Sequence, residues 1–261
     1  MLRVENLSKT FHPGTPDAKQ ALNNVSFHLQ RGDFVTIIGS NGAGKSTLFN
    51  AICGDFLTDS GSIILDGEDI TFQKSHIRSR QIGRLFQDPM RGSAPGMSIE
   101  ENLSLAAGHG GWFSAISKGD REKFRDHLAR LDMGLEDRMK QPVGLLSGGQ
   151  RQALTLMMAT INVPKVLILD EHTAALDPGT ADKVLKITKE VVEENNITTL
   201  MVTHNMQNAL DLGNRTFMMD SGQIVLDVKG EERAKLTVND LLEKFRKEAG
   251  KSLDNDRILL S

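Results

Sequence analysis

The sequence predicts an α/β fold with a helical segment inserted into it, and three observations lead to this prediction. Short apolar runs rich in β-branched residues alternate with stretches that repeat apolar residues at helical spacing. Strand signals are missing from about residue 90 to 162 and return afterwards. A glycine-rich stretch at 39–46 stands between an apolar strand and an apolar helix, where α/β proteins place a phosphate-binding loop.

Composition indicates a globular protein and limits its partners. Of the 261 residues, 39% are hydrophobic and 25% are charged, which is typical of a folded domain. The net charge of −3 gives no general electrostatic basis for binding nucleic acid or an anionic membrane surface. The sequence has one cysteine, no apolar run near ~18 residues and no signal-peptide core, and this predicts a cytosolic chain that reaches a membrane only through a partner.

Strand-like runs lie in both the first and the last third of the chain. The run 34–39, FVTIIG, is predicted to be a buried strand because it is apolar and β-branched. In the segment 60–70, Asp66-Gly67 between two β-type runs is typical of a two-residue hairpin turn. The other strands are predicted at 2–11, 23–30, 165–171, 197–204, 215–220 and 223–228.

Helix starts in the middle of the chain are marked by capping residues. Ser98 and Glu101 have the spacing of a capping box. The segment 120–133 repeats apolar residues at helical spacing. Asp177 and Pro178 supply an N-cap and a first-turn proline for a helix that ends near residue 195.

The chain after residue 228 is predicted to add one helix. Thr237 and Asp240 form a cap-like pair ahead of a segment whose apolar residues fall on one face. We expect this amphipathic helix to pack back on the core, and we expect residues 252–261 to form a loose tail.

The stretch 39–46, GSNGAGKS, matches the full pattern of a phosphate-binding loop. Its glycines let backbone N–H groups point at phosphates, Lys45 adds a positive charge, and the Ser46 hydroxyl is a ligand for Mg²⁺. The predicted nucleotide contacts here are Gly39, Ser40, Asn41, Gly42, Ala43, Gly44, Lys45, Ser46 and Thr47.

A second candidate site is the acidic pair after the apolar run 165–169. Asp170, at the end of the predicted strand, is expected to hold Mg²⁺ through water. Glu171 projects one step further and is expected to polarise an attacking water.

Together the motifs resemble those of the ABC transporter family, specifically its nucleotide-binding subunit. Besides the phosphate loop and the acidic pair, they are Gln87 in RLFQDP, LSGGQ at 146–150, ALD at 175–177 and His204 in MVTHN. The resemblance extends over nearly the whole chain to about residue 227.

The family's fold is a P-loop NTPase core with an N-terminal antiparallel β subdomain and an inserted α-helical subdomain. The resemblance thus implies an ATPase domain at 1–227, with its core at 1–89 and 163–227 and its helical insert at about 90–162. The C-terminal helix and tail then occupy 228–261.

The resemblance also implies a homodimer that forms on ATP binding. Two subunits of this family stand head to tail, with each ATP between one subunit's phosphate loop and the other's LSGGQ. Ser147, Gly148, Gly149 and Gln150 are therefore expected to hold the γ-phosphate bound by the sister subunit.

The remaining site roles follow from the same resemblance. His204 is expected to contact the γ-phosphate, and Gln87 to reach the metal or the attacking water. Phe11 stands where the family has an aromatic ring that stacks on adenine. His172 replaces a proline that is frequent after the acidic pair, and we expect it to be tolerated and not catalytic.

The single motif set without a fused membrane segment is most similar to importer subunits, with a weaker resemblance to those of tryptophan- or tyrosine-type solute importers. This implies ATP and Mg²⁺ as cofactors, and a membrane permease and an extracytoplasmic solute-binding protein as partners. The chain would then lie peripherally on the inner face of the cell membrane. Three alternatives stay open: an exporter subunit, a soluble ABC ATPase acting as a mechanical switch on an intracellular partner, and a nucleotide-binding regulator that does not hydrolyse ATP.

Overall fold

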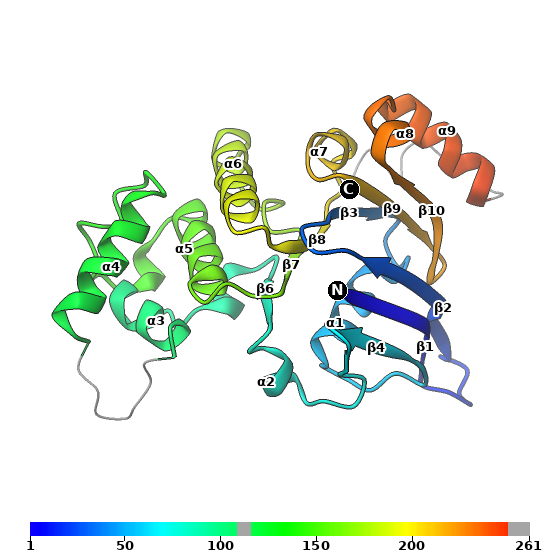
Figure 1. The fold of residues 1–261 in the computed structure, drawn as a ribbon, viewed down its shortest axis with the longest axis horizontal. Coiled ribbons are helices and arrows are strands. Elements are labelled where there is room, and N and C mark those ends of the chain that lie inside the picture. The colour runs from blue at the N-terminus through cyan, green and yellow to red at the C-terminus, as the bar shows by residue number, and fades with distance from the viewer. Residues whose placement is uncertain (109–115, 250–261) are drawn as a thin grey trace. The chain divides into compact units, whose positions relative to one another are not determined.

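The computed structural model describes residues 1–108 and 116–249, and the α/β fold predicted from the sequence is confirmed (Figure 1). The chain forms two compact units, one made of residues 1–82 with the chain from 196 onward, the other of residues 83–195. The predicted helical insert, 90–162, lies inside the second unit, which also contains flanking strands and a helix. The predicted domain boundaries themselves stay a prediction.

The first unit begins with an antiparallel sheet in the order β2-β1-β4-β5. Its strands are β1 (Leu2–Phe11), β2 (Lys19–Leu29), β4 (Ser60–Leu65) and β5 (Glu68–Asp69). The hairpin predicted at Asp66-Gly67 is confirmed, since both residues have positive φ, 50° and 84°, as a type I′ turn requires.

The same unit contains four strands of a second sheet, in the order β10-β9-β3-β8. β3 (Phe34–Gly39) pairs in parallel with β8 (Thr198–Val202) and with β9 (Arg215–Asp220), and β10 (Gln223–Lys229) closes antiparallel on β9. β3 and β8 are almost entirely buried, which explains their continuous apolar sequences. Helices α1 (Lys45–Cys53) and α2 (Ser75–Arg78) complete this part of the unit.

Three helices follow the sheet strands: α7 (Met206–Asp211), α8 (Gly230–Ala234) and α9 (Val238–Ala249). The cap predicted for α9 is confirmed, because the Thr237 N–H and hydroxyl donate to Asp240 Oδ2 at 2.8 and 2.7 Å. Leu241 and Phe245 are fully buried in one cluster with residues of α7, β3, β9 and β10, so the expectation that α9 packs back on the core is confirmed. The predicted tail, 252–261, lies outside the described residues.

The second unit is mainly helical. Its helices are α3 (Ile99–Ala106), α4 (Lys118–Ala129), α5 (Gly148–Thr160) and α6 (Pro178–Glu194), with 3-10 turns at Pro89–Gly92 and Val143–Leu145. Two strands, β6 (Ile82–Leu85) and β7 (Val166–Asp170), lie side by side. The capping box Ser98–Glu101 and the Asp177 N-cap are confirmed. β6 was not predicted.

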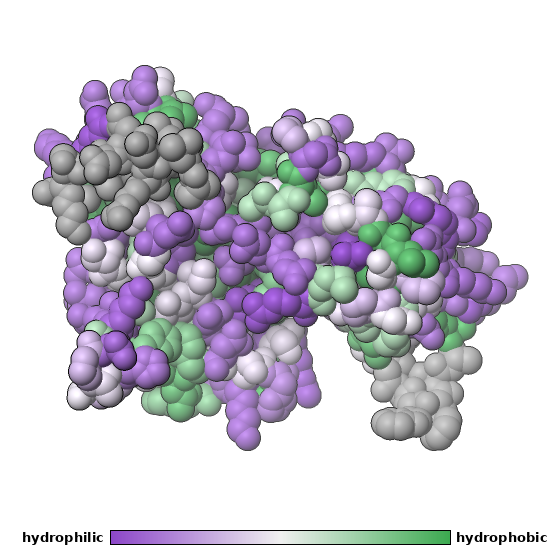
Figure 2. All heavy atoms as spheres, turned by 180° about the vertical axis from the view of Figure 1, so that it is seen from behind, coloured by the Kyte–Doolittle hydropathy of each residue, from purple (hydrophilic) through white to green (hydrophobic). Residues whose placement is uncertain are grey.

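The surface of the described residues is largely hydrophilic. Figure 2 shows hydrophobic residues of one face in separate small patches among hydrophilic ones. Single large apolar side chains such as Phe72, Leu145 and Leu105 are more than half exposed. Within the described ranges, no helix is long and apolar enough to cross a membrane.

Candidate functional site

The phosphate loop joins β3 to α1 in the first unit, and the local packing requires its glycines. Gly44 is the N-cap of α1 with φ 102°, a left-handed conformation that side chains disfavour. A Cβ on Gly44 would meet Ala21 O at 2.5 Å, and one on Gly39 would meet Met219 O at 2.2 Å. The loop therefore needs glycine at both positions to lie close to the neighbouring strands.

Lys45 begins α1 and is directed back across the loop. Its Nζ donates to Gly39 O at 2.8 Å and to Ser40 O at 3.1 Å, and the residue is only 5% exposed. Ser46 follows on the first turn and is exposed. A helix N-terminus with N–H groups, a buried ammonium and an exposed hydroxyl together form a site that suits a phosphate and its metal ion.

His204 lies at the same end of the sheet as the phosphate loop. Ile37 of β3 pairs with Val202 of the parallel strand β8, so the two strands end at the same edge of the sheet. Gly39 ends β3 at this edge, and His204 lies two residues after the end of β8. The Thr203 N–H donates to Ile37 O at 3.2 Å, which holds the His204 turn against β3. The structure thus brings His204 near the loop, as an interaction with a bound phosphate requires.

Phe11 ends β1 and is half-buried. Its ring packs edge-on against Phe56 with centroids 5.4 Å apart, and Lys9 Nζ lies 5.8 Å from the Phe11 centroid. A partly exposed aromatic pair with a nearby cation can support a planar base. The stacking of adenine on Phe11 stays a prediction.

Asp170 and Glu171 lie at the end of β7 in the second unit. Asp170 Oδ2 is 3.7 Å from Arg84 Nη2 on β6, and both side chains are less than a fifth exposed. Glu171 has φ +48°, a conformation that costs a non-glycine residue of order 1 kcal/mol. The chain bends at Glu171, directly after β7. Arg84 belongs to the site's surroundings but was not among the predicted residues.

Gln87 lies two residues beyond β6 and is exposed. Asp88, next to it, caps the following 3-10 turn by accepting from Met90 N at 2.9 Å. The exposed Gln87 side chain is accessible to a ligand, as the predicted role requires.

The LSGGQ segment begins α5 and uses its residues in two different ways. Ser147 is the N-cap, and Ser147 and Gln150 form a capping box, with Gln150 N–H donating to Ser147 Oγ at 3.3 Å. Gln150 also donates through Nε2 to Met133 O. A Cβ on Gly149 would meet Thr180 Cγ2 at 2.0 Å, so Gly149 allows α5 to pack closely on α6.

Ser147 and Gly148, in contrast, are exposed at the N-terminus of α5. The first-turn N–H groups of a helix have no partner within the helix and favour an anion. The structure therefore separates the motif into an inner half, Gly149 and Gln150, that packs within the subunit, and an outer half, Ser147 and Gly148, that is open to another molecule although Ser147 also caps α5.

His172 is directed into the protein and away from the solvent. It is 2% exposed, and its Nε2 lies 3.2 Å from Thr188 Oγ1 on α6. Thr188 donates its hydroxyl hydrogen to Val184 O, so Nε2 is the protonated nitrogen and donates to Thr188. Nδ1 is buried with no hydrogen-bond partner among the described residues. Burial lowers the pKa of His172 to about 4, which keeps the ring neutral near pH 7.

This burial predicts a pH-dependent stability. A histidine whose pKa is about 4 in the folded state and 6.5 when unfolded binds its proton preferentially in the unfolded chain, so stability is lost as the pH falls below 6.5. The loss should be about 2 kcal/mol at pH 5. His172→Gln keeps a donor for Thr188 but does not titrate. Urea unfolding of both proteins at pH 7.5 and pH 5 should show the extra loss in the wild type alone; equal losses would contradict the assignment.

Mg²⁺ in nucleotide sites takes most of its ligands from phosphate oxygens and water, with one or two from the protein. No group of three or more metal-binding side chains occurs within residues 1–108 and 116–249. The hydroxyl of Ser46 and the carboxylate of Asp170 are hard oxygen donors of the kind Mg²⁺ prefers, and with Gln87 they remain the predicted set.

Comparison with known proteins identifies the family of the chain. The family model described as ABC transporter matches residues 22–174. The chain is 46% identical to a tyrosine transport ATP-binding protein of Clostridioides difficile, over 94% of this chain and 98% of the relative.

Two solved structures resemble the fold. A dimeric, post-hydrolysis form of the ATP-binding cassette MJ0796, bound to ADP and Pi, has a TM-score of 0.76 at 27% identity and covers 88% of this chain and 98% of its own. The cbiO1 protein of Clostridium perfringens, part of the ABC transporter complex cbiONQ, has a TM-score of 0.73 at 28% identity and covers 95% of both chains.

Proposed function

The chain belongs to the ABC transporter family and is an ATP-binding subunit with ATPase activity, and from this premise we propose its specific task. Two copies sandwich two ATP molecules and drive conformational change in a membrane permease that takes up a small solute such as an amino acid. The dimer is proposed because the outer half of LSGGQ, Ser147 and Gly148, is exposed at the N-terminus of α5, where a phosphate held by a second copy can bind.

Within each subunit the phosphate loop binds its own ATP. The N–H groups around Gly42 and Gly44 and the Lys45 ammonium neutralise the β- and γ-phosphates, and the Ser46 hydroxyl ligates the metal. Mg²⁺, when bound there, would stabilise the negative charge of the reacting phosphates. Phe11 supports the adenine by stacking.

Hydrolysis requires a water aligned with the γ-phosphorus. Glu171 accepts a hydrogen bond from this water and polarises it, while Asp170 and Gln87 hold the metal. His204 donates to a γ-phosphate oxygen, which stabilises the charge that develops in the transition state. When the bond breaks, the phosphate that linked the two subunits is lost, and the dimer opens.

The class of transported solute is proposed from the similarity to the tyrosine transport ATP-binding protein. The 46% identity to a tyrosine transport ATP-binding protein over nearly the full length supports an amino-acid uptake system. Such a system includes a permease and, outside the cytoplasm, a solute-binding protein. The chain then lies on the inner face of the cell membrane, held by the permease.

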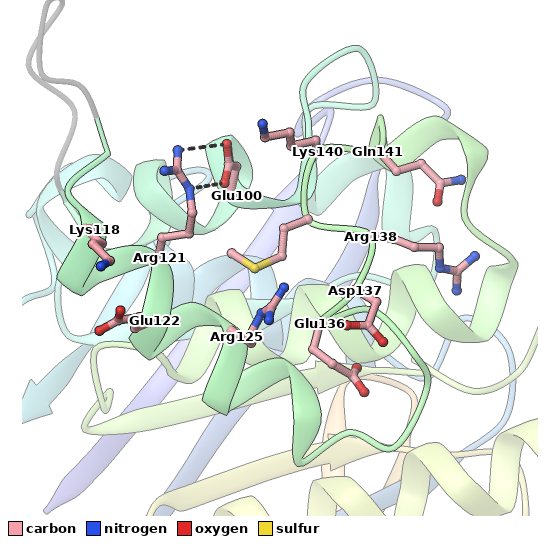
Figure 3. Close-up of a pocket in the computed structure, with 11 residues that line it drawn as sticks. Glu100, Lys118, Arg121, Glu122, Arg125, Glu136, Asp137, Arg138, Lys140 and Gln141 are labelled. Atoms are coloured by element: carbon pink, nitrogen blue, oxygen red, sulfur yellow. Dashed lines mark hydrogen bonds and ion pairs between the residues drawn. The ribbon is translucent and has the colours of Figure 1, made fainter.

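The permease is expected to contact the segment from Asp88 to Leu105. Met90 and Leu105 are 39% and 52% exposed there. Glu100, in the same segment, lines a hollow of about 660 Å³ together with α4 and residues 136–141 (Figure 3). Arg121 donates two hydrogen bonds of 2.7 and 3.3 Å to Glu100, so this wall of the hollow is charged.

Crosslinking tests this contact. Met90→Cys and Leu105→Cys, each made after Cys53→Ser, should form disulfides with cysteines in the cytoplasmic loops of a coexpressed permease. Lys186→Cys on α6, also well exposed, is the control and should not react. Crosslinks to soluble proteins alone would contradict the transporter and favour an ATPase acting on an intracellular partner.

A further inference from the structure

Arg233, on the short helix α8, is buried at the end of another helix. It is 7% exposed, and its Nη2 donates to Ala209 O at 2.8 Å and to Leu210 O at 3.0 Å. It also donates to Leu212 O. These carbonyls lie at the C-terminal end of α7. The last carbonyls of a helix have no N–H partner within the helix, and this end favours a positive charge. Arg233 therefore caps the C-terminal end of α7.

One of these carbonyls, that of Ala209, also connects α7 to β3, the strand that leads into the phosphate loop. Ala209 O also accepts from Thr36 Oγ1 of β3 at 2.8 Å and from Thr216 Oγ1 of β9 at 3.2 Å. Arg233 Nε donates to Thr216 Oγ1 at 2.9 Å, which closes the network. The four residues of this network, Thr36, Ala209, Thr216 and Arg233, are all buried. Water therefore cannot replace a lost hydrogen-bond partner without opening the core.

The other end of α7 carries His204. The Asn205 side chain caps this end by accepting from Asn208 N at 2.9 Å, and His204 immediately precedes it. Met206, in the first turn, packs in the cluster that contains Leu241 and Phe245 of α9. A helix of six residues has little stability of its own, so its position depends on these attachments.

We propose that Arg233 is a positioning residue for His204: by fixing the C-terminal end of α7 to β3 and β9, it holds the turn that presents the histidine to the γ-phosphate. This rests on the proposed role of His204 in hydrolysis. The last part of the chain thereby takes part in catalysis without touching ATP. A sub-ångström shift of the histidine lowers turnover because the reaction depends on an aligned hydrogen bond.

A double-mutant cycle tests the proposal, with kcat and KM for ATP measured for Arg233→Gln, His204→Ala and the double variant. Arg233→Gln should lower kcat about tenfold or more and leave KM within about twofold, since the phosphate loop is unchanged. In the His204→Ala background the same change should have almost no further effect, because both act through one group. Lys235→Gln, an exposed change at the C-cap of the same helix, should leave kcat unchanged.

Three results separate the possible failures. Normal kcat for Arg233→Gln, or an equal further loss of kcat in the His204→Ala background, would overturn the positioning role while leaving the proposed function intact. Normal kcat for His204→Ala would overturn the proposed role of His204 in hydrolysis, and this inference with it. If Arg233→Gln does not fold, Arg233→Lys, which retains a cation for the α7 carbonyls but not the planar fork, takes its place in the same cycle with the same criteria.

Discussion

Replacing His204 with alanine is expected to lower ATP turnover about 100-fold while ATP binding stays largely intact. Lys45 and the loop N–H groups supply most contacts to the bound phosphates, so the ground state loses little. The transition state loses a positioned donor at the reacting phosphate, and such a loss costs on the order of 10² in rate. Phosphate release at saturating ATP gives the turnover, and equilibrium binding of a fluorescent ATP analogue gives the affinity.

His76→Ala is the matched control, because His76 is exposed on α2 and no part of the proposed mechanism uses it. It should keep both activity and affinity. ATPase activity of His204→Ala close to that of the wild type would remove the histidine from the mechanism. A parallel loss of ATP affinity would instead assign His204 to ground-state binding.

Much of the fold could be predicted because its signals are local. Two-residue hairpins, capping boxes and proline at a helix start depend on neighbours within about four residues. Asp66-Gly67, Ser98 with Glu101, and Asp177 therefore mark the elements that the structure contains. Apolar runs such as 34–39 indicated the buried strands for the same reason.

What escaped prediction depends on distant residues. β6 has four residues and α7 six, too short for a periodic signal, and their packing partners stabilise them. Arg233 acts on carbonyls 21 to 24 positions earlier in the chain. In the sequence, Arg233 is one of several charged residues near apolar ones. That pattern is equally typical of an exposed arginine, so it does not indicate that Arg233 is buried.

The motif residues illustrate the same limit. LSGGQ indicated one anion site, whereas the structure assigns Gly149 to helix packing and Gln150, with Ser147, to a capping box, and leaves Ser147 and Gly148 exposed. His172 was expected to be tolerated, and its buried bond to Thr188 supplies a physical reason for its presence.

The largest effect is expected at Ser147. Glu171→Gln retains the size of the side chain but loses the carboxylate that activates water, so it should trap ATP and accumulate a dimer. Adding Ser147→Arg places a long side chain where the sister subunit's phosphate must enter. The cost should be several kcal/mol at each of two symmetric sites, enough to abolish the dimer at micromolar protein.

A control separates this effect from the loss of a helix cap. Ser117 is the exposed N-cap of α4, as Ser147 is of α5. Ser117→Arg removes a cap of the same kind, worth about 1 kcal/mol, at a helix that has no proposed role in the dimer. Combined with Glu171→Gln it should dimerise normally. The Ser147→Arg/Glu171→Gln protein should still bind ATP as a monomer, because its own phosphate loop is unchanged.

Light scattering on these proteins in ATP and Mg²⁺ tests most directly whether LSGGQ binds the ATP of a second copy. The Glu171→Gln protein and its Ser117→Arg derivative should have twice the monomer mass, and the Ser147→Arg/Glu171→Gln protein the monomer mass. Equal dimerisation of all three would contradict the proposal and reduce Ser147 to the cap of α5.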